Sequence, residues 1–354
     1  MWLESLQVAD LRRIQHAHVE LGPGLNVFTG SNAQGKTSIL EAVAVLARGR
    51  SFRTDQVQSL IRRGAGALRA SGVAISDTRR TALDVEVSGA TRRLLVDGCE
   101  VTARGYQGRL EAVVYATERL RIVRGTMRDR RQFVDRAAAA QSVSYRQVLR
   151  DYERVLLQRN AALERGGADV GTWTERFLQL GTDLRVRRAS YVARLSAALE
   201  KAFNPAGEVY DILLVPGEVS APLVRDQLER ELRERSRDEL RARRSLVGPH
   251  RDLVVLRVGA EAAAEGASSG QVRSLLLALV LTMLEVYREQ TGEAPVALLD
   301  DLDSELDDAR ADELCQEVCR RGQALVTTAH PEWAQRLGRR GRLFRVQEGM
   351  VSAA

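Results

Sequence analysis

Hydrophobic and polar residues alternate along the first part of the chain, from Leu3 to Leu21. This period of two predicts half-buried β-strands, because successive side chains of a strand point to opposite faces. A short apolar run at 25–29 follows, and a helical pattern begins at Lys36. Further strand candidates, bounded by Gly, Ser and Asp, lie at 68–75, 81–87, 93–96 and 112–115. We expect a meander of mostly antiparallel strands.

The pattern becomes helical near Arg119 and remains so to Arg244. Apolar residues recur at i, i+3 and i+4 over 145–156 and over 177–199, which predicts two amphipathic helices. A pair of glycines at 166–167 predicts the turn between them. The other elements predicted in this region are a strand at 209–215 and a helix at 223–243. We interpret the middle third of the chain as an inserted helical lobe.

The composition is that of a globular protein with one large or two smaller domains. The chain has 354 residues, of which 44% are hydrophobic and 28% charged. Its net charge of +6 indicates a polyanionic partner only weakly, because 53 basic residues are scattered among 47 acidic ones. Three cysteines cannot form a disulfide framework, and Cys315 and Cys319 are predicted to pack in the core rather than to bind a metal.

Neither the N-terminal residues nor the longest apolar run indicates a membrane protein. The first residues, Met-Trp-Leu-Glu-Ser-Leu, lack the apolar centre of a secretory leader. The longest apolar run, 275–284, is expected to be too short to span a bilayer. We therefore expect a protein of the reduced cytoplasm that has no membrane partner.

Residues 30–37 read Gly-Ser-Asn-Ala-Gln-Gly-Lys-Thr and match G-x-x-x-x-G-K-[ST], the phosphate-binding loop called Walker A. The glycines let backbone N–H groups point at phosphate oxygens, Lys36 reaches the β- and γ-phosphates, and Thr37 ligates Mg²⁺. The chain keeps this lysine although it has only two lysines against 51 arginines. The alternative is an ordinary glycine-rich turn before a helix. The predicted ATP-binding residues are Gly30, Ser31, Asn32, Ala33, Gln34, Gly35, Lys36, Thr37 and Ser38.

Two later strand candidates also end in polar residues. The run 295–299 ends at Asp300 and Asp301, which is the form of a Walker B element. Asp300 is predicted to hold Mg²⁺ through its water shell, and Asp301 to act as a base or to orient the attacking water. Another strand ends at His330, on the carboxyl edge where α/β sheets bind ligands. The alternatives are a buried strand that ends in acids and a surface histidine. The candidate catalytic residues are Lys36, Asp301 and His330.

The stretch 268–271 reads Ser-Ser-Gly-Gln and precedes a helix predicted at 272–285. One interpretation is that the small polar residues only cap this helix. The other is that this second helix N-terminus cradles a phosphate from the opposite side. Both interpretations stay open from the residues alone.

Together these motifs resemble the ABC-type ATPase heads and, within that class, the RecF family of bacterial recombination mediators. The stretches that carry the resemblance are 24–41, 145–160, 247–252, 268–277, 298–307 and 327–330. The resemblance implies an α/β fold, in which an ABC-type head of mixed β-sheets and helices carries an inserted, mainly helical lobe. The implied domains are the N-terminal part of the head at 1–118, the lobe at 119–244 and the C-terminal part of the head at 245–354.

The resemblance also implies roles for single residues. The signature, which completes the ATP site of a second chain, comprises Ser268, Ser269, Gly270 and Gln271. The D-loop residues are Ser304 and Asp307, and His330 is the switch histidine. Asp301 stands where the wider class has Glu, which implies slow hydrolysis suited to a switch. No glutamine follows the strand at 112–115, so no Q-loop residue is assigned.

The implied function is ATP-dependent DNA binding in DNA repair, DNA replication and the SOS response. Two chains would dimerise on DNA around ATP and Mg²⁺, and a weak, DNA-stimulated ATPase would act as a molecular switch. RecO and RecR are the implied partners in loading RecA onto single-stranded gaps. The alternatives are another ABC- or SMC-like DNA-repair ATPase, a metabolic P-loop kinase, and a scaffold with a decayed nucleotide site.

Residues 119–136 contain seven arginines. We predict that some of them contact DNA, either a duplex or a junction of single and double strands. The predicted contacts are Arg119, Arg121, Arg124, Arg128 and Arg130. The alternative is that these side chains only solvate the surface of the lobe.

Overall fold

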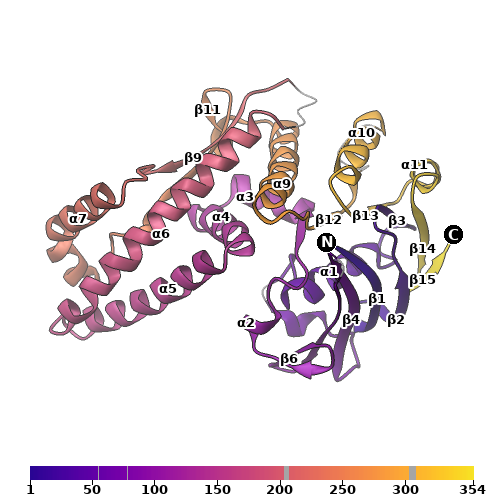
Figure 1. The fold of residues 1–354 in the computed structure, drawn as a ribbon, viewed down its shortest axis with the longest axis horizontal. Coiled ribbons are helices and arrows are strands. Elements are labelled where there is room, and N and C mark those ends of the chain that lie inside the picture. The colour runs from indigo at the N-terminus through magenta and orange to yellow at the C-terminus, as the bar shows by residue number, and fades with distance from the viewer. Residues whose placement is uncertain (55, 78, 203–206, 303–307) are drawn as a thin grey trace. The chain divides into compact units, whose positions relative to one another are not determined.

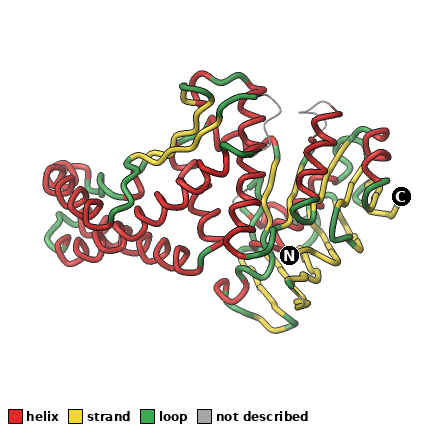
Figure 2. The backbone as a smooth tube through the Cα atoms, turned by 45° about the horizontal axis from the view of Figure 1, so that its top comes forward, coloured by secondary structure: helices red, strands yellow, loops and turns green. Residues whose placement is uncertain are grey.

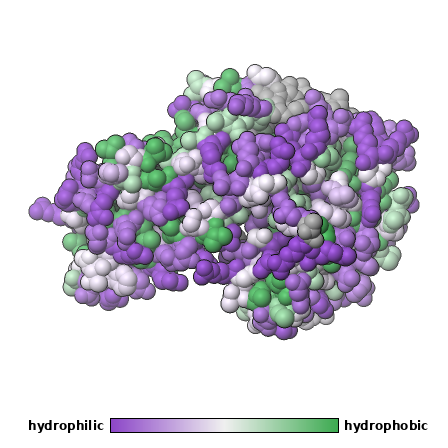
Figure 3. All heavy atoms as spheres, viewed as in Figure 1, coloured by the Kyte–Doolittle hydropathy of each residue, from purple (hydrophilic) through white to green (hydrophobic). Residues whose placement is uncertain are grey.

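A computed structural model describes residues 1–54, 56–77, 79–202, 207–302 and 308–354. Contacts between Cα atoms group the chain into two compact units. Unit 1 contains Met1–Leu120 and Leu276–Ala354, and unit 2 contains Arg121–Ala202 and Ala206–Leu275. Figure 1 labels their elements, Figure 2 distinguishes helices from strands, and Figure 3 shows a mostly hydrophilic surface on the face viewed.

The first sheet of unit 1 is antiparallel, with the strand order β2-β1-β4-β5-β6-β7. Its strands are β1 (Trp2–Leu11), β2 (Ile14–Glu20), β4 (Ala67–Ser76), β5 (Arg79–Ser88), β6 (Thr91–Val96) and β7 (Cys99–Glu100). In β5, buried residues alternate with more exposed ones from Thr81 to Val87. The predicted period of two and the antiparallel meander are therefore confirmed.

The second sheet of unit 1 has the order β15-β14-β3-β13-β12-β8 and is parallel except for β15. Its strands are β3 (Leu25–Thr29), β8 (Ala112–Tyr115), β12 (Val296–Leu299), β13 (Ala324–Thr328), β14 (Arg342–Gln347) and β15 (Met350–Ala353). The expectation that β8 belongs to the antiparallel meander is wrong, because β8 pairs in parallel with β12. All four residues of β8 are buried, as is usual for a strand inside a parallel sheet.

Helix α1 (Lys36–Arg48) lies between the two sheets. It contacts β1, β4 and β5 of the first sheet and β8 and β13 of the second. Every residue from Ile39 to Ala47 is buried, so this helix forms the centre of the core. It begins at the predicted Lys36 and ends at Gly49, whose φ of 62° is left-handed and favours glycine. The loop before α1 is consequently held in a fixed position at the edge of the second sheet.

Helices α10 (Asp308–Cys319) and α11 (Pro331–Gly338) pack on the second sheet, on the side away from α1 (Figure 1). Cys315 is buried and burial raises the pKa of its thiol, while burial raises the pKa of Cys319 to about 11. The predicted core packing of Cys315 is therefore confirmed. The remaining short helices of unit 1 are η1 (Val57–Leu60), α2 (Ala103–Tyr106) and η2 (Thr117–Leu120).

Helix α9 (Ser269–Thr291) is longer than the apolar run within it, and the boundary between the units falls between its residues Leu275 and Leu276. By length and composition alone the whole helix could cross a membrane, although the apolar run 275–284 within it is shorter. However, 67% of its most apolar window is buried inside the protein. This burial is typical of the core helix of a globular protein.

Unit 2 is mainly helical, as predicted. Its helices are α3 (Arg121–Arg124), α4 (Met127–Gln141), α5 (Val143–Glu164), α6 (Val170–Leu199), α7 (Ala221–Ala242), η3 (Pro249–Arg251) and α8 (Ala263–Gly266). A small antiparallel sheet has the order β11-β10-β9, with β9 (Tyr210–Val215), β10 (Leu253–Val258) and β11 (Glu261–Ala262). Gly166 and Gly167, both with positive φ, form the predicted turn between α5 and α6.

Unit 2 extends to Leu275, whereas the sequence placed the end of the lobe at 244. The first reason is that β10 pairs with β9 along its whole length. The second is that Asp252 is fully buried against two arginines of α6, at 2.8 Å from Arg185 and 2.9 Å from Arg188. Arg188 also binds Asp135 of α4 at 2.9 Å. The segment 247–252 is thus held by buried, paired charges within unit 2.

His250 lies in the same segment and is held in its neutral form. Its Nδ1 accepts a hydrogen bond from the Tyr152 hydroxyl at 2.7 Å, and its Nε2 donates to the Ser245 carbonyl oxygen at 3.1 Å. Burial lowers the pKa of His250 to about 4, and the charges of Arg131, Arg159 and Arg251 act in the same direction. Protonation would reverse the Tyr152 hydrogen bond, because Nδ1 would become a donor and the Tyr152 oxygen would have to accept.

We expect acid to destabilise the protein through His250. The unfolded chain binds a proton near pH 6.5 and the folded chain only near pH 4, so stability is lost as the pH falls through this window. Between pH 7 and 4.5 the free energy of unfolding should fall by about 2 kcal/mol from this group. Urea denaturation of the native chain and of His250→Gln across this range checks the prediction. Parallel pH curves for the two proteins would contradict it.

Candidate nucleotide-binding site

Three parallel strands end side by side at one edge of the second sheet. Thr29 of β3 pairs with Thr328 of β13, and Val326 of β13 pairs with Leu299 of β12. The segments that follow these strands carry the Walker A loop, the two aspartates of Walker B and His330. The carboxyl edge of a parallel sheet is the usual place for a ligand. The fold therefore brings together candidate residues that are up to 300 positions apart in the chain.

The Walker A loop has a backbone that depends on its glycines. A Cβ atom on Gly30 would lie 2.2 Å from the carbonyl oxygen of Val346 in β14. Gly35 is the N-cap of α1, with a left-handed φ of 114° and no side-chain capping bond. The first N–H groups of α1 are thus left for another acceptor, which suits an anion at this helix end.

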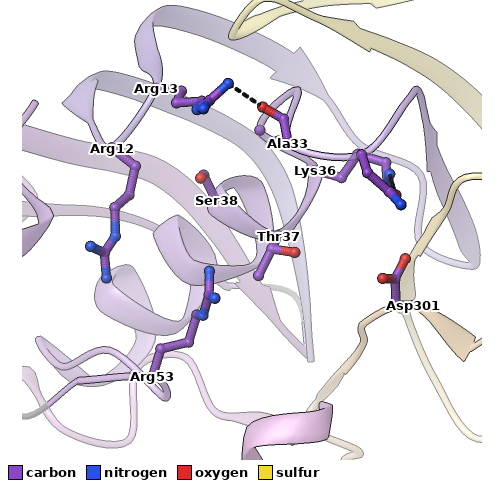
Figure 4. A pocket seen from close by; sticks show the side chains of 10 residues that line it. Arg12, Arg13, Ala33, Lys36, Thr37, Ser38, Arg53 and Asp301 are labelled. Carbon is purple, nitrogen blue, oxygen red and sulfur yellow. Dashed lines mark hydrogen bonds between the residues drawn. The ribbon is translucent and has the colours of Figure 1, made fainter.

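The Walker A loop is braced by residues that the sequence analysis did not single out. The backbone N–H groups of Glu348 and Gly349, in the turn between β14 and β15, donate to Gln34 at 2.6 Å and 3.0 Å. Arg13 donates to the carbonyl oxygen of Ala33 at 2.8 Å (Figure 4). In the sequence, these contacts are indicated only by an Arg-Arg turn and a Glu-Gly turn. Such turns do not show which residues they contact.

Lys36 is nearly buried, with 6% of its surface exposed. Its ammonium donates to the carbonyl oxygens of Gly30 at 2.8 Å and Ser31 at 3.2 Å, and to Asn32 Oδ1 at 3.4 Å. All three of these acceptors are neutral groups. A phosphate oxygen would be a stronger acceptor for the same ammonium.

The Walker B aspartates are tied to Walker A through hydroxyl groups. Thr37 Oγ1 donates to Asp300 Oδ1 at 3.0 Å, and Thr327 Oγ1 donates to the same oxygen at 2.6 Å. The N–H of Asp301 donates to Thr327 Oγ1 at 2.9 Å. Thr37 and Asp300 thus present hard oxygen ligands beside the loop, which fits the ligand preference of Mg²⁺.

The space beside the Walker A loop is a cavity of about 580 Å³. It is lined by Arg12, Arg13, Asn32, Ala33, Gly35, Lys36, Thr37, Ser38, Arg53 and Asp301. In Figure 4 the side chains of Lys36 and Asp301 face the same space. The sequence analysis did not identify the three lining arginines as part of the site. Arg12 is oriented by Glu41 at 3.1 Å. A cavity lined by four cations and one carboxylate suits a polyphosphate.

One other predicted residue, His330, belongs to this edge. His330 is exposed at the start of α11, and its N–H donates to Thr328 Oγ1 at 2.9 Å. The predicted D-loop residues Ser304 and Asp307 lie outside the described residues.

Comparison with known proteins agrees with this geometry. The model of the RecF/RecN/SMC N terminal domain matches residues 2–352. The DNA replication and repair protein RecF of Symbiobacterium thermophilum is 35% identical, over 99% of this chain and 98% of its own length. That of Acidothermus cellulolyticus is also 35% identical, over the full length of both chains. The chain belongs to the RecF family.

Solved structures support the family assignment. The recombination mediator protein RecF bound to ATP, from the RecFOR pathway, has a TM-score of 0.91 at 25% identity and covers 100% of this chain and 97% of that chain. The Smc head domain of Pyrococcus furiosus shares the fold, with a TM-score of 0.61 at 14% identity. The fold is thus the ABC-type ATPase head with an added helical unit. The RecF family acts in DNA replication and repair. Family membership therefore excludes the alternative that the chain is a metabolic P-loop kinase.

The RecF signature predicted at 268–271 forms a capping box at the start of α9. Ser268 Oγ accepts from the N–H of Gln271 at 3.2 Å, and Gln271 Oε1 accepts from the N–H of Ser268 at 2.7 Å. The capping interpretation is therefore confirmed. Yet a Cβ atom on Gly270 would meet only Ser268 Oγ, at 3.9 Å, within the part of the chain that the structure describes. Packing within this chain does not require a glycine there, which leaves room for a second role.

The arginines predicted to bind DNA separate into two groups. Arg121, Arg124 and Arg128 are exposed, and Arg124 donates to the carbonyl oxygen of Ala267 at 3.0 Å. The prediction for Arg130 is wrong, because its side chain is buried and donates to the carbonyl oxygens of Val123 and Gly125. Arg130 therefore fixes the turn between α3 and α4. Arg119 is partly buried and belongs to unit 1.

Proposed function

We propose that this RecF-family protein is an ATP-controlled, DNA-binding recombination mediator. Two chains join around ATP on DNA, hydrolyse it slowly and then separate. The observation that carries the proposal is the hydrogen bond of 3.0 Å from Thr37 to Asp300, beside the ammonium of Lys36. It joins the two motifs that handle the phosphates and the metal of a nucleotide.

Each residue at the edge of the sheet has a proposed part in handling ATP. Lys36 exchanges loop carbonyl oxygens for the β- and γ-phosphates. Thr37 and Asp300 hold Mg²⁺, which neutralises the charge of the phosphates when it is bound. Asp301 orients the attacking water, and its side chain is one methylene shorter than that of Glu, which favours slow turnover. His330 contacts the γ-phosphate.

The site is proposed to be completed by a second chain. The chain has one Walker A loop and one signature, and a two-fold interface would form two complete sites at once. The exposure of Ser268 and Gly270 supports a contact with the γ-phosphate of the partner chain. ADP lacks this phosphate and would release the dimer, which makes hydrolysis a switch.

The partners are proposed from family membership. Two of the solved neighbours are RecF, the recombination mediator of the RecFOR pathway, which supports RecO and RecR as partners. Loading of RecA onto single-stranded gaps and a cytoplasmic location follow from the same resemblance. The experiment that tests the function is DNA binding with ATP, with ADP and without nucleotide, using gapped, duplex and single-stranded competitors at stated salt. ATP-independent binding to all three would contradict the proposal.

Asp301→Asn should bind ATP with nearly native affinity and hydrolyse it roughly 10²–10⁴ times more slowly, because a general base contributes about that factor. Asp300→Asn should instead weaken nucleotide binding that depends on Mg²⁺. Equilibrium binding and single-turnover rates separate the two effects. A native rate in Asp301→Asn would move the water-orienting role elsewhere, with His330 as the next candidate.

Changing Arg121, Arg124 and Arg128 to Glu should weaken DNA binding and flatten its salt dependence. The slope of log K against log salt should fall by about 0.9 for each lost phosphate contact. A variant with Arg230, Arg233 and Arg237 of α7 changed to Glu is the matched control, since these exposed residues carry the same charge. Equal slopes in the two variants would mean that the first group only solvates the surface.

A further inference from the structure

Thr327 bonds to both Walker B aspartates. We propose that Thr327 is a positioning residue that sets the directions of Asp300 and Asp301 in the nucleotide site. The proposal rests on the proposed function of those aspartates. It assigns Thr327 no contact with ATP.

The hydroxyl of Thr327 donates to one of these residues and accepts from the other. Its single hydrogen goes to Asp300 Oδ1 at 2.6 Å, and one lone pair accepts the N–H of Asp301 at 2.9 Å. The side chain has 0% of its surface exposed. Water therefore cannot readily replace the hydroxyl if it is removed.

The backbone on each side of this contact is fixed differently. Thr327 lies inside β13, where it pairs with Phe28 of β3. Asp301 follows the end of β12 and has a left-handed φ of 52°, a conformation that costs energy for a residue with a side chain. The N–H bond to Thr327 thus anchors a strained residue to a rigid strand. Without it, the Asp301 N–H loses this anchor to β13, so the direction of the Asp301 carboxylate is fixed less closely.

Thr327 and Thr37 bind the same oxygen of Asp300 but serve different purposes. Thr37 lies in the first turn of α1, and its hydroxyl is also a proposed ligand of the metal. Thr327 belongs to the interior of the sheet, so it holds Asp300 whether or not nucleotide is present. Outer residues of this kind typically change metal affinity or activity by about 10–100-fold.

The test uses Thr327→Val and Thr327→Ala, which lack the hydroxyl, and Thr327→Ser, which keeps it. The matched control is Thr282→Val, because Thr282 is a buried threonine of α9 whose hydroxyl donates to the Ala278 carbonyl oxygen. In the nucleotide-free protein, NMR should show that the Asp301 amide exchanges roughly tenfold faster in the Thr327→Val or Thr327→Ala variant than in the native chain. The Thr327→Ser variant and the Thr282 control should keep the native exchange rate.

Nucleotide measurements complete the test. The hydroxyl-free variants should bind ATP normally without Mg²⁺, need about tenfold more Mg²⁺ and turn over at least about tenfold more slowly, with KM little changed. Native amide protection in both hydroxyl-free variants, or equal defects in Ser and Val, would overturn the proposal. Failure of the native chain to bind ATP would instead overturn the proposed function, because the exchange result needs no nucleotide.

Discussion

Lys36→Met should abolish measurable ATP binding. The native ammonium supplies the positive charge at the centre of the loop, where it contacts the carbonyl oxygens of Gly30 and Ser31. Without it, those oxygens face the phosphates directly, and affinity should fall by at least about 100-fold, which corresponds to roughly 3 kcal/mol. Isothermal titration with ATP, in the presence and absence of Mg²⁺, measures the loss.

The chain provides a matched control for this experiment. Lys201 is its only other lysine and is exposed, so Lys201→Met removes the same charge from unit 2 and leaves the loop unchanged. Lys36→Arg should retain binding but lose hydrolysis, because the planar fork cannot take the position of a compact ammonium. Full turnover of ATP by Lys36→Met would contradict the nucleotide assignment.

Ser268→Arg should bind ATP normally, yet fail to dimerise and to hydrolyse it. An arginine at this exposed position fills the space through which the γ-phosphate of the other chain would approach. The substitution also removes the cap of α9, since Ser268 Oγ accepts the N–H of Gln271. Loss of a cap costs about 1 kcal/mol of stability and is a separate effect.

Ser268→Ala separates the cap from the interface. It loses the same capping bond without adding bulk, so it should dimerise with ATP more weakly than the native chain but measurably. ATP binding by titration and molecular mass by light scattering are the two readouts. Equal dimerisation by Ser268→Arg and the native chain would place the ATP contact outside the signature.

Local pattern was enough to predict most elements of the fold. The period of two identified β1 and β5, and the apolar run before Lys36 identified β3 and α1, because these signals depend only on neighbours in the chain. The run 112–115 was assigned to the wrong sheet, since four apolar residues do not specify a partner strand or its direction. The structure groups residues as far as Leu275 with the helical unit, beyond the expected end at 244. Pairing of β10 with β9 is a long-range contact.

The candidate site was predicted unevenly. Walker A has a fixed spacing that the phosphate chemistry requires, and Walker B has the form of an apolar strand ending in acids, so Lys36 and Asp300 could be named as candidates. Thr327 carried no such signal, because its hydroxyl acts through residues 26 or more positions away. Arg130 showed the opposite error. A run of arginines indicates an exposed basic surface on average, but it does not reveal which member turns inward to bind carbonyl oxygens.

The central claim is that ATP joins two chains through the Walker A loop of one and the signature of the other. Sedimentation velocity at micromolar concentration, with ATP and Mg²⁺, with ADP and Mg²⁺ and without nucleotide, tests it most directly. The account predicts a dimer with ATP and a monomer in the other two conditions, with Asp301→Asn holding the dimer longest. A chain that stays monomeric with ATP and still hydrolyses it would contradict the account.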